Sequence, residues 1–230
     1  MADSIADDFG RQVFLSTAKF IAFLGVLVLA LGGSLHYWQG WLFWINFSLC
    51  TATVGYYFYK HDPALVRRRL NVGPVAEKEP SQKRIQFFAM IFVCALFAVS
   101  ALDYRFGWSH VRWAYVLLGN VLIIVGYAVM FFVFRENSFA ASTIQVDPDQ
   151  KVISSGPYAW IRHPMYFGAA IMFAGVPLAL GSWWGLTVFV LLIGVLAARL
   201  LDEEKYLTCH LPGYDDYRQK VRRRLVPGLW

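Results

Sequence analysis

Six long apolar stretches constrain this chain more than any other feature of its sequence. They run approximately over 13–35, 41–59, 85–102, 111–134, 165–180 and 183–201. Each is near the roughly 20 residues that a helix needs to cross the hydrocarbon core of a bilayer. Inside that core a segment must satisfy its own backbone hydrogen bonds, so each stretch is predicted to be a helix. The sequence therefore predicts an all-α, polytopic membrane helix bundle.

The fifth stretch leaves the number of crossings open. It is short and contains Pro177, which interrupts the hydrogen bonding of a helix interior. We predict about six transmembrane helices, with five crossings and a re-entrant turn as the alternative. Composition agrees with a membrane protein, because 16% of the residues are charged where a soluble domain has about a quarter.

The Lys and Arg residues lie mainly on one side of the predicted membrane. Most of the 21 are in 60–84, in 135–163 and from Arg199 onward, whereas the other side holds only Arg105 and Arg112. Cytoplasmic segments of membrane proteins carry such an excess, so six crossings place both termini in the cytoplasm. The formal net charge of +6 is interpreted as membrane topology, and we predict no nucleic-acid partner. The three scattered cysteines predict no metal site.

One pattern of polar residues predicts a site at the last two helices. Proline suits the first turn of a helix, so the fifth helix is predicted to begin at about Pro164 and to reverse at 181–182. The returning helix then brings distant side chains to one membrane face. These side chains are Arg162, His163, Tyr166, Glu203 and Glu204. The alternative is that they merely flank the membrane, with Glu203 and Glu204 ending a solvated helix.

These residues carry a family resemblance. The segments GPYAWIRHPMYFG (156–168), DEEKYL (202–207) and GYDDYRQKVRRRLVPGLW (213–230) resemble the C-terminal signature of integral-membrane methyltransferases. That family includes isoprenylcysteine carboxyl methyltransferases, phospholipid methyltransferases and their prokaryotic relatives. The segment that begins Asp62-Pro63-Ala64-Leu65 and includes Glu77-Lys78 also resembles a short cytoplasmic loop of the prokaryotic isoprenylcysteine-type members.

The resemblance implies S-adenosylmethionine held between the last two helices and the C-terminal tail. By the family's motif the cofactor pocket would be lined by Arg162, His163, Tyr166, Glu203 and Glu204. Tyr158, Tyr214 and Tyr217 offer further aromatic faces to the sulfonium or the adenine. If the acceptor is a carboxylate, Arg222, Arg223 and Arg224 are candidates to orient it, with Arg224 and Arg223 favoured. The alternative is that these arginines meet anionic lipid headgroups.

The implied reaction is methyl transfer to a lipophilic or lipid-anchored acceptor at the cytoplasmic membrane face. A prenylated carboxylate (O-methylation) and a lipid amine (N-methylation) both remain open as acceptors. Residues 1–230 are expected to form a single membrane domain in the cytoplasmic (inner) membrane of a prokaryote. Within it, 1–135 would be a helical scaffold with a cytoplasmic loop over 60–84, and 136–230 the cofactor-binding and catalytic region. The loop is a candidate cover for the cofactor or for the acceptor entrance.

Two other functions are weighed against methyl transfer. NADPH-dependent membrane reductases of the sterol-reductase type share an Arg-His-Pro-x-Tyr motif, but Phe167-Gly168-Ala169 follows it here where their pattern has Gly-Asp. A non-enzymatic role such as transport is disfavoured because no charged residue lies in the middle of an apolar stretch. Asn46 and Asn120, the most polar residues there, are predicted to form hydrogen bonds between helices.

Overall fold

A computed structural model describes residues 2–70 and 72–226, and the side chains from residue 8 onward. The last four residues of the C-terminal signature, 227–230, lie outside the described part. The described chain is helical and contains no strand. Its elements are α1 (Ala2–Gly32), α2 (Trp38–His61), α3 (Pro63–Leu70), α4 (Pro80–Phe106), α5 (Trp113–Glu136), the 3-10 helix η1 (Gly156–Ala159), α6 (Pro164–Ala179), α7 (Trp184–His210) and α8 (Tyr214–Lys220).

All six apolar stretches form helices, so the prediction of an all-α bundle is confirmed. By length and composition, four are suited to cross a membrane: Asp8–Gly32 in α1, and α4, α5 and α7. Helix α2 has 24 residues, but its many Trp, Tyr and polar side chains keep it below the apolarity of those four. Helix α6 has 16 residues, or roughly 24 Å at 1.5 Å per residue. For α2 and α6 a complete crossing stays a prediction.

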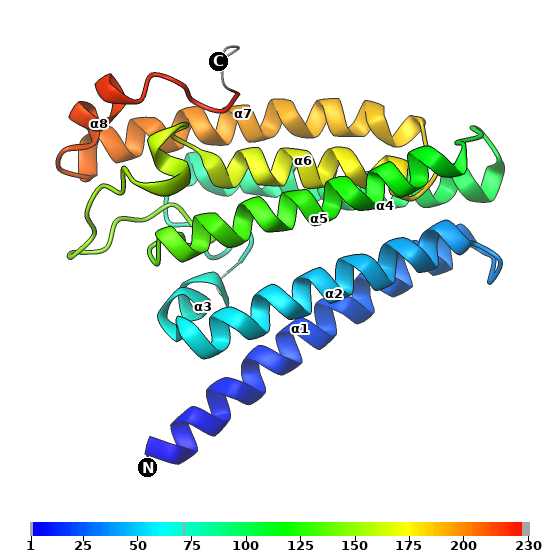
Figure 1. The fold of residues 1–230 in the computed structure, drawn as a ribbon, viewed down its shortest axis with the longest axis horizontal. Coiled ribbons are helices and arrows are strands. Elements are labelled where there is room, and N and C mark those ends of the chain that lie inside the picture. The colour runs from blue at the N-terminus through cyan, green and yellow to red at the C-terminus, as the bar shows by residue number, and fades with distance from the viewer. Residues whose placement is uncertain (1, 71, 227–230) are drawn as a thin grey trace.

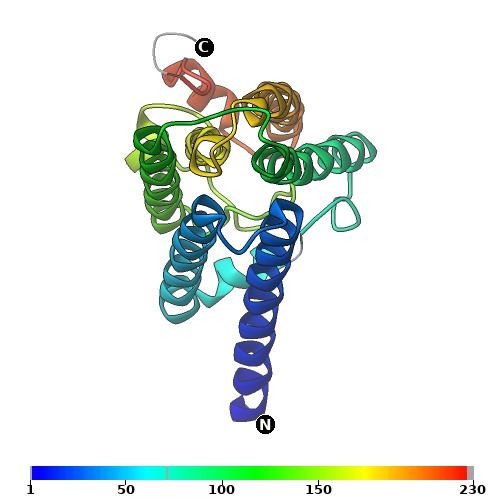
Figure 2. The ribbon, with the colours of Figure 1, turned by 90° about the vertical axis from the view of Figure 1, so that its right-hand side faces the viewer.

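The long helices run back and forth between two ends of the molecule (Figure 1). One end carries α3, the irregular segment 137–155 with η1, and α8, and we call it the loop end. The opposite end holds only the short connections 33–37, 107–112 and 180–183, and we call it the turn end. Seen from the turn end, α1 and α2 stand beside a group formed by α4, α5, α6 and α7 (Figure 2).

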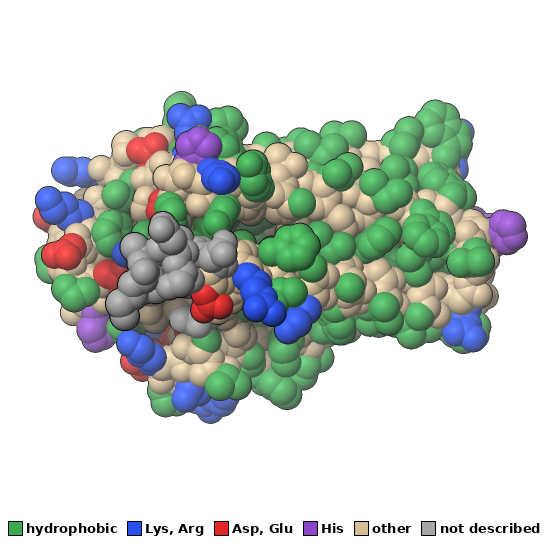
Figure 3. All heavy atoms as spheres, turned by 90° about the horizontal axis from the view of Figure 1, so that it is seen from below, with side chains coloured by type: hydrophobic (Ala, Val, Ile, Leu, Met, Phe, Trp, Pro, Cys, Tyr) green, Lys and Arg blue, Asp and Glu red, His purple; other side chains and the backbone are tan. Residues whose placement is uncertain are grey.

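The charged side chains follow the same division. On the face in Figure 3 most of the charged groups lie toward the loop end, a few lie at the turn end, and apolar side chains cover much of the length between. Many large apolar side chains of the helices are exposed, including Phe14, Phe23 and Ile45. An apolar girdle between two polar ends is what a bilayer requires of an embedded surface. The chain is therefore an integral membrane protein.

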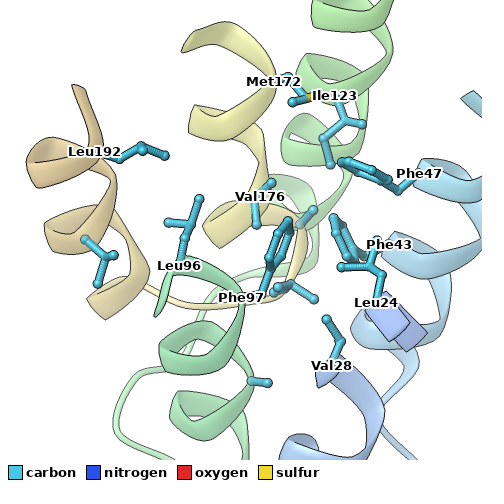
Figure 4. Close-up of a cluster of buried hydrophobic side chains, with 14 of the residues drawn as sticks. Leu24, Val28, Phe43, Phe47, Leu96, Phe97, Ile123, Met172, Val176 and Leu192 are labelled. Carbon is cyan, nitrogen blue, oxygen red and sulfur yellow. The ribbon is translucent and has the colours of Figure 1, made fainter. Parts of the chain in front are cut away.

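A buried apolar core joins the two groups of helices (Figure 4). Phe43 and Phe47 from α2 meet Phe97 from α4, with ring centroids 5.8 and 6.3 Å from that ring. Val176 from α6 and Leu192 from α7 belong to the same cluster and are fully buried. This core fixes the distance between α6 and α7, and those two helices carry the site described below.

Polar contacts add to this packing inside the membrane region. The side-chain amide of Asn46 donates to the side-chain oxygen of Asn120, 3.0 Å away, and so links α2 to α5. The predicted interhelical hydrogen bond is confirmed. At the turn end, Asp103 accepts hydrogen bonds from Ser109 and Ser182. That carboxylate ties the end of α4 to the α6–α7 turn.

Two helices were not predicted from the sequence, α3 and α8. Helix α3 begins after Asp62, whose Oδ1 accepts a hydrogen bond from the backbone nitrogen of Leu65 at 3.0 Å. Pro63 takes the first position, where its missing N–H costs nothing. Asp-Pro before Leu65 was therefore a helix-start signal inside a segment that was interpreted as a loop.

Helices α5 and α6 approach so closely that their contact tolerates only glycine. A Cβ atom on Gly119 would lie 2.3 Å from the backbone nitrogen of Ala179 and 2.6 Å from the carbonyl oxygen of Gly175. At Gly126 the added atom would lie 2.7 Å from the carbonyl oxygen of Gly168. Small residues permit such close packing of membrane helices, and it places the start of α6 against the end of α5.

We expect Gly119→Ala to destabilise the protein by about 1–3 kcal/mol, because the new methyl group collides with backbone atoms that cannot rotate away. The measurement is thermal unfolding in detergent. Gly194→Ala in α7 is the matched control, since nothing lies within 4 Å of a Cβ atom there and alanine favours the helix. Equal unfolding midpoints for the two variants would show that the close contact is not essential.

Candidate functional site

The start of α6 is held by the C-terminal tail. Pro164 occupies the first turn of α6, which confirms the predicted helix start. Just before it, the backbone nitrogens of Arg162 and His163 donate to the carbonyl oxygens of Arg223 and Arg224, each at 3.0 Å. The guanidinium of Arg162 also donates to carbonyl oxygens of the tail. The tail therefore packs along the mouth of the hairpin.

Glu204 on α7 is the centre of these polar contacts. Its Oε1 lies 2.7 Å from Nε of Arg162 and 3.3 Å from Nε2 of His163, and its Oε2 lies 3.1 Å from Nε of Arg224. The Glu204 side chain is only 5% exposed. A carboxylate this deeply buried is tolerated when cations and hydrogen-bond donors surround it. Glu204 thus joins α7, the start of α6 and the tail.

The carboxylate of Glu203, the residue before Glu204, points away from the tail. Tyr166 on α6 donates its hydroxyl hydrogen to Oε2 of Glu203 at 2.6 Å. Nε of Arg199 donates to the same hydroxyl oxygen at 3.1 Å. Since Glu203 and Glu204 are adjacent on a helix, their side chains leave it in different directions. One carboxylate faces a pocket and the other faces the tail.

The pocket lies at the loop end, between the hairpin, α8 and the segment 137–153. It holds about 780 Å³ of space that protein atoms do not fill, its open mouth included. Apolar side chains such as Ile144, Leu207 and Leu211 form part of the wall. Tyrosine, histidine, arginine and glutamate side chains form the polar part of the wall.

The structure brings most of the predicted site residues to this pocket. Those that line it are Tyr158, Arg162, His163, Tyr166, Glu203, Tyr214 and Tyr217. Glu204, Arg223 and Arg224 are not among its lining residues. Arg224 instead lines a more open hollow on the outside, together with Arg218 and Arg222. The predicted convergence of α6 and α7 residues is therefore observed, and Glu204 and the tail arginines lie behind the pocket wall or outside it.

Tyr158, Tyr214 and Tyr217 are protonated at neutral pH. Burial raises the pKa of Tyr158 to about 12, and the charge of Glu203 also raises it, while the hydrogen bond from Asn137 lowers it. Burial also raises the pKa of Tyr214 and Tyr217. The Tyr217 hydroxyl donates to the carbonyl oxygen of Tyr158 at 2.8 Å. The Tyr214 hydroxyl is buried and has no hydrogen-bond partner among the described residues.

Two charged residues next to the site were not predicted from the sequence. Arg199 was counted only as a basic residue at the end of a helix, and Glu77 only as part of the 61–84 segment. In the structure they form a buried ion pair, with Nη2 of Arg199 2.7 Å from Oε1 of Glu77. The resemblance of the loop around Glu77 was the only signal that pointed to it. Nothing in the spacing of Arg199 distinguished it from other flanking cations.

Comparison with known proteins gives a consistent assignment for the C-terminal part of the chain. Residues 114–211 match the phospholipid methyltransferase family. A stretch of 75 residues is 33% identical to the protein-S-isoprenylcysteine O-methyltransferase of Schizosaccharomyces pombe, and it covers 32% of each chain. The match therefore spans about a third of the length of that relative. The family region extends from α5 to the end of α7, and so includes both carboxylates and the start of α6.

We expect Glu204→Gln to destabilise the protein by about 3–5 kcal/mol, because it leaves buried cations without their carboxylate. Glu203→Gln is the matched control one residue away, since Glu203 is less buried and has the Tyr166 hydroxyl as its donor. Thermal unfolding in detergent measures both. Similar losses in the two variants would contradict the central role of Glu204.

Proposed function

We propose that this chain, whose residues 114–211 match the phospholipid methyltransferase family, transfers a methyl group from S-adenosylmethionine to a lipophilic acceptor. The resemblance predicted from the sequence is confirmed by that match. The observation that carries the proposal is the pocket beside Glu203, Tyr166 and Tyr214 at the loop end.

The polar groups of the pocket fit an amino-acid cofactor that bears a nucleoside. The Tyr214 hydroxyl is a buried polar group without a partner among the described residues, and such a group usually finds one in a ligand or in water. The free lone pairs of Glu203 suit an ammonium group or ribose hydroxyls. His163 and Arg162 would lie at the amino-acid end. The faces of Tyr158 and Tyr217 suit the sulfonium or the adenine ring.

The protein residues have a limited task in this reaction. Bound S-adenosylmethionine supplies a methyl group that its sulfonium already activates. Glu203 and Tyr166 would orient the cofactor, and the buried wall would keep water from the acceptor. Arg162 is already bound by Glu204 and by tail carbonyl oxygens. We therefore infer that Arg162 and Glu204 act mainly by holding the pocket together.

The acceptor would reach the pocket from the bilayer. An apolar groove runs between α5 and the start of α6, lined in part by Phe132, Trp160 and Phe167. Trp160 is 69% exposed, and Pro164 lines both this groove and the pocket. A lipid or a prenylated chain fits such a surface. If the acceptor carries a carboxylate, Arg224 and Arg223 remain the candidates to orient it.

We further propose that the loop end faces the cytoplasm of a prokaryotic cell, with both termini on that side. The excess of Lys and Arg in 60–84, in 135–163 and in the tail supports this orientation. Helices α1–α5 would serve mainly as a scaffold, and 136–230 would supply the cofactor-binding and catalytic region. Anionic lipid headgroups would then lie near the tail arginines.

The cofactor proposal is tested by calorimetry with S-adenosylhomocysteine on the full chain in detergent. We expect wild type to bind, and Glu203→Gln and His163→Ala to bind at least about tenfold more weakly, because each loses a hydrogen bond to a charged group. Glu79→Gln is the matched control, since Glu79 is exposed at the start of α4. Binding of NADPH by a wild-type protein that ignores S-adenosylhomocysteine would favour a reductase.

Tyr214→Phe should change stability and affinity in opposite directions. Removing a buried hydroxyl that has no hydrogen-bond partner in the described part of the chain should leave stability unchanged or raise it by up to about 1 kcal/mol. The same change should weaken S-adenosylhomocysteine binding, because the ligand loses a hydrogen bond. Thermal unfolding without ligand and calorimetry with ligand measure the two effects. A loss of stability with unchanged affinity would place the role of this hydroxyl in the fold.

A further inference from the structure

Arg199 lies between the pocket and the segment that precedes α4. It is 6% exposed, and its guanidinium donates in four directions. Nε donates to the Tyr166 hydroxyl at 3.1 Å, and Nη2 donates to Glu77 at 2.7 Å and to the carbonyl oxygen of Ser142 at 3.0 Å. Nη1 donates to the side-chain oxygen of Gln86. One planar group thus joins α4, α6, α7 and two connecting segments.

Glu77 extends this set of contacts to the pocket wall. It is 2% exposed, and its second oxygen accepts a hydrogen bond from the backbone nitrogen of Ile144 at 3.1 Å. Thr143 and Ile144 line the pocket. The ion pair therefore contacts the pocket on two sides, through Tyr166 and through the backbone of 142–144.

We propose that Arg199 and Glu77 are positioning residues of the site, which act on the bound cofactor through Tyr166 and Glu203. This proposal rests on the proposed cofactor site. Neither residue lines the pocket, so neither would touch the ligand. Arg199 would orient the hydroxyl hydrogen of Tyr166, and Glu77 would hold the backbone of 142–144 in the pocket wall.

The hydrogen bonds run in one direction, from Arg199 to Tyr166 and from Tyr166 to Glu203. A phenol has one hydrogen to donate and can also accept. Because Arg199 donates to the Tyr166 oxygen, the tyrosine hydrogen is left for Glu203, and the two atoms lie 2.6 Å apart. Glu203 is thereby held in one orientation with its remaining lone pairs available to the pocket. Preorganisation of this kind improves binding by reducing the ordering that the ligand would otherwise impose.

The same ion pair gives the segment 72–79 a function. Its Glu77 lies far from Arg199 in sequence, at a separation of 122 positions. A second contact nearby joins Ser81 on α4 to Asp202 on α7, at 2.8 Å between their side-chain oxygens. This segment is part of the 60–84 loop that was predicted as a candidate cover, and through Glu77 it contacts the pocket wall at Ile144.

A double-mutant cycle tests the proposal. Arg199→Lys keeps a positive charge beside Glu77, but an ammonium group cannot reproduce the planar fork that reaches Tyr166, Glu77 and Ser142 together. Tyr166→Phe removes the hydroxyl through which Arg199 would act. The single variants, the double variant and wild type are compared for S-adenosylhomocysteine affinity by calorimetry and for unfolding temperature, with the full chain in detergent.

We expect Arg199→Lys to weaken affinity about tenfold in wild type, and less than about twofold when Tyr166 is already phenylalanine, because residues that act in one network are not additive. Glu77→Gln should behave in the same way. Arg68→Lys is the matched control, since Arg68 also pairs with a carboxylate, Asp147 at 2.8 Å, but has about a quarter of its side chain exposed. It should leave affinity unchanged.

Equal losses of affinity in both backgrounds would overturn the proposal, and so would unchanged affinity in Arg199→Lys. Hydrogen exchange of a peptide over 142–146 provides a readout without ligand, because Glu77→Gln weakens the acceptor of the Ile144 amide. Faster exchange is expected, and unchanged exchange would contradict the link to the wall. A third outcome separates the two proposals. If wild type binds no S-adenosylhomocysteine while Glu77→Gln still exchanges faster than wild type, the cofactor proposal is refuted and the ion pair only supports the fold.

Discussion

The buried carboxylate of Glu204 is the interaction on which the loop end depends. It accepts from Arg162, His163 and Arg224, which come from the start of α6 and from the tail. Charges at this depth are stable only as a set, because each isolated ion would lose its hydration without replacement. The site therefore needs α6, α7 and the tail together. Glu204 holds these elements, which leaves the adjacent Glu203 free to face the pocket.

The membrane region and the loop end are stabilised by different forces. Between the two ends, helices meet through aromatic and aliphatic side chains and through the glycine contact of α5 with α6. Lipid provides no hydrophobic force between helices, so close packing and a few hydrogen bonds such as Asn46–Asn120 set their positions. At the loop end, ion pairs and backbone hydrogen bonds connect irregular segments. The rigid hairpin thus presents its polar residues to segments that close around them.

Much of the site could be predicted from the sequence, but the roles within it could not. Pro164 marked the helix start, and the return of α7 brought Glu203 and Glu204 to Arg162 and His163. Spacing along the chain cannot tell which of two adjacent carboxylates faces a cavity, because that depends on the rotation of α7 against α6. It also cannot reveal the pairing of Glu77 with Arg199, since α4, α5, α6 and part of α7 lie between these two residues in the sequence.

The sequence by itself determined the class of the fold, the location of the helices and the end at which the site lies. Those properties follow from hydrocarbon thickness, from the cost of unpaired backbone groups and from the placement of charge, all of which act locally along the chain. Only the tertiary structure decided that Glu204 binds the tail, that Glu203 faces the pocket and that Arg199 joins Tyr166 to Glu77. These are contacts between distant segments, and their geometry depends on how closely α5, α6 and α7 pack.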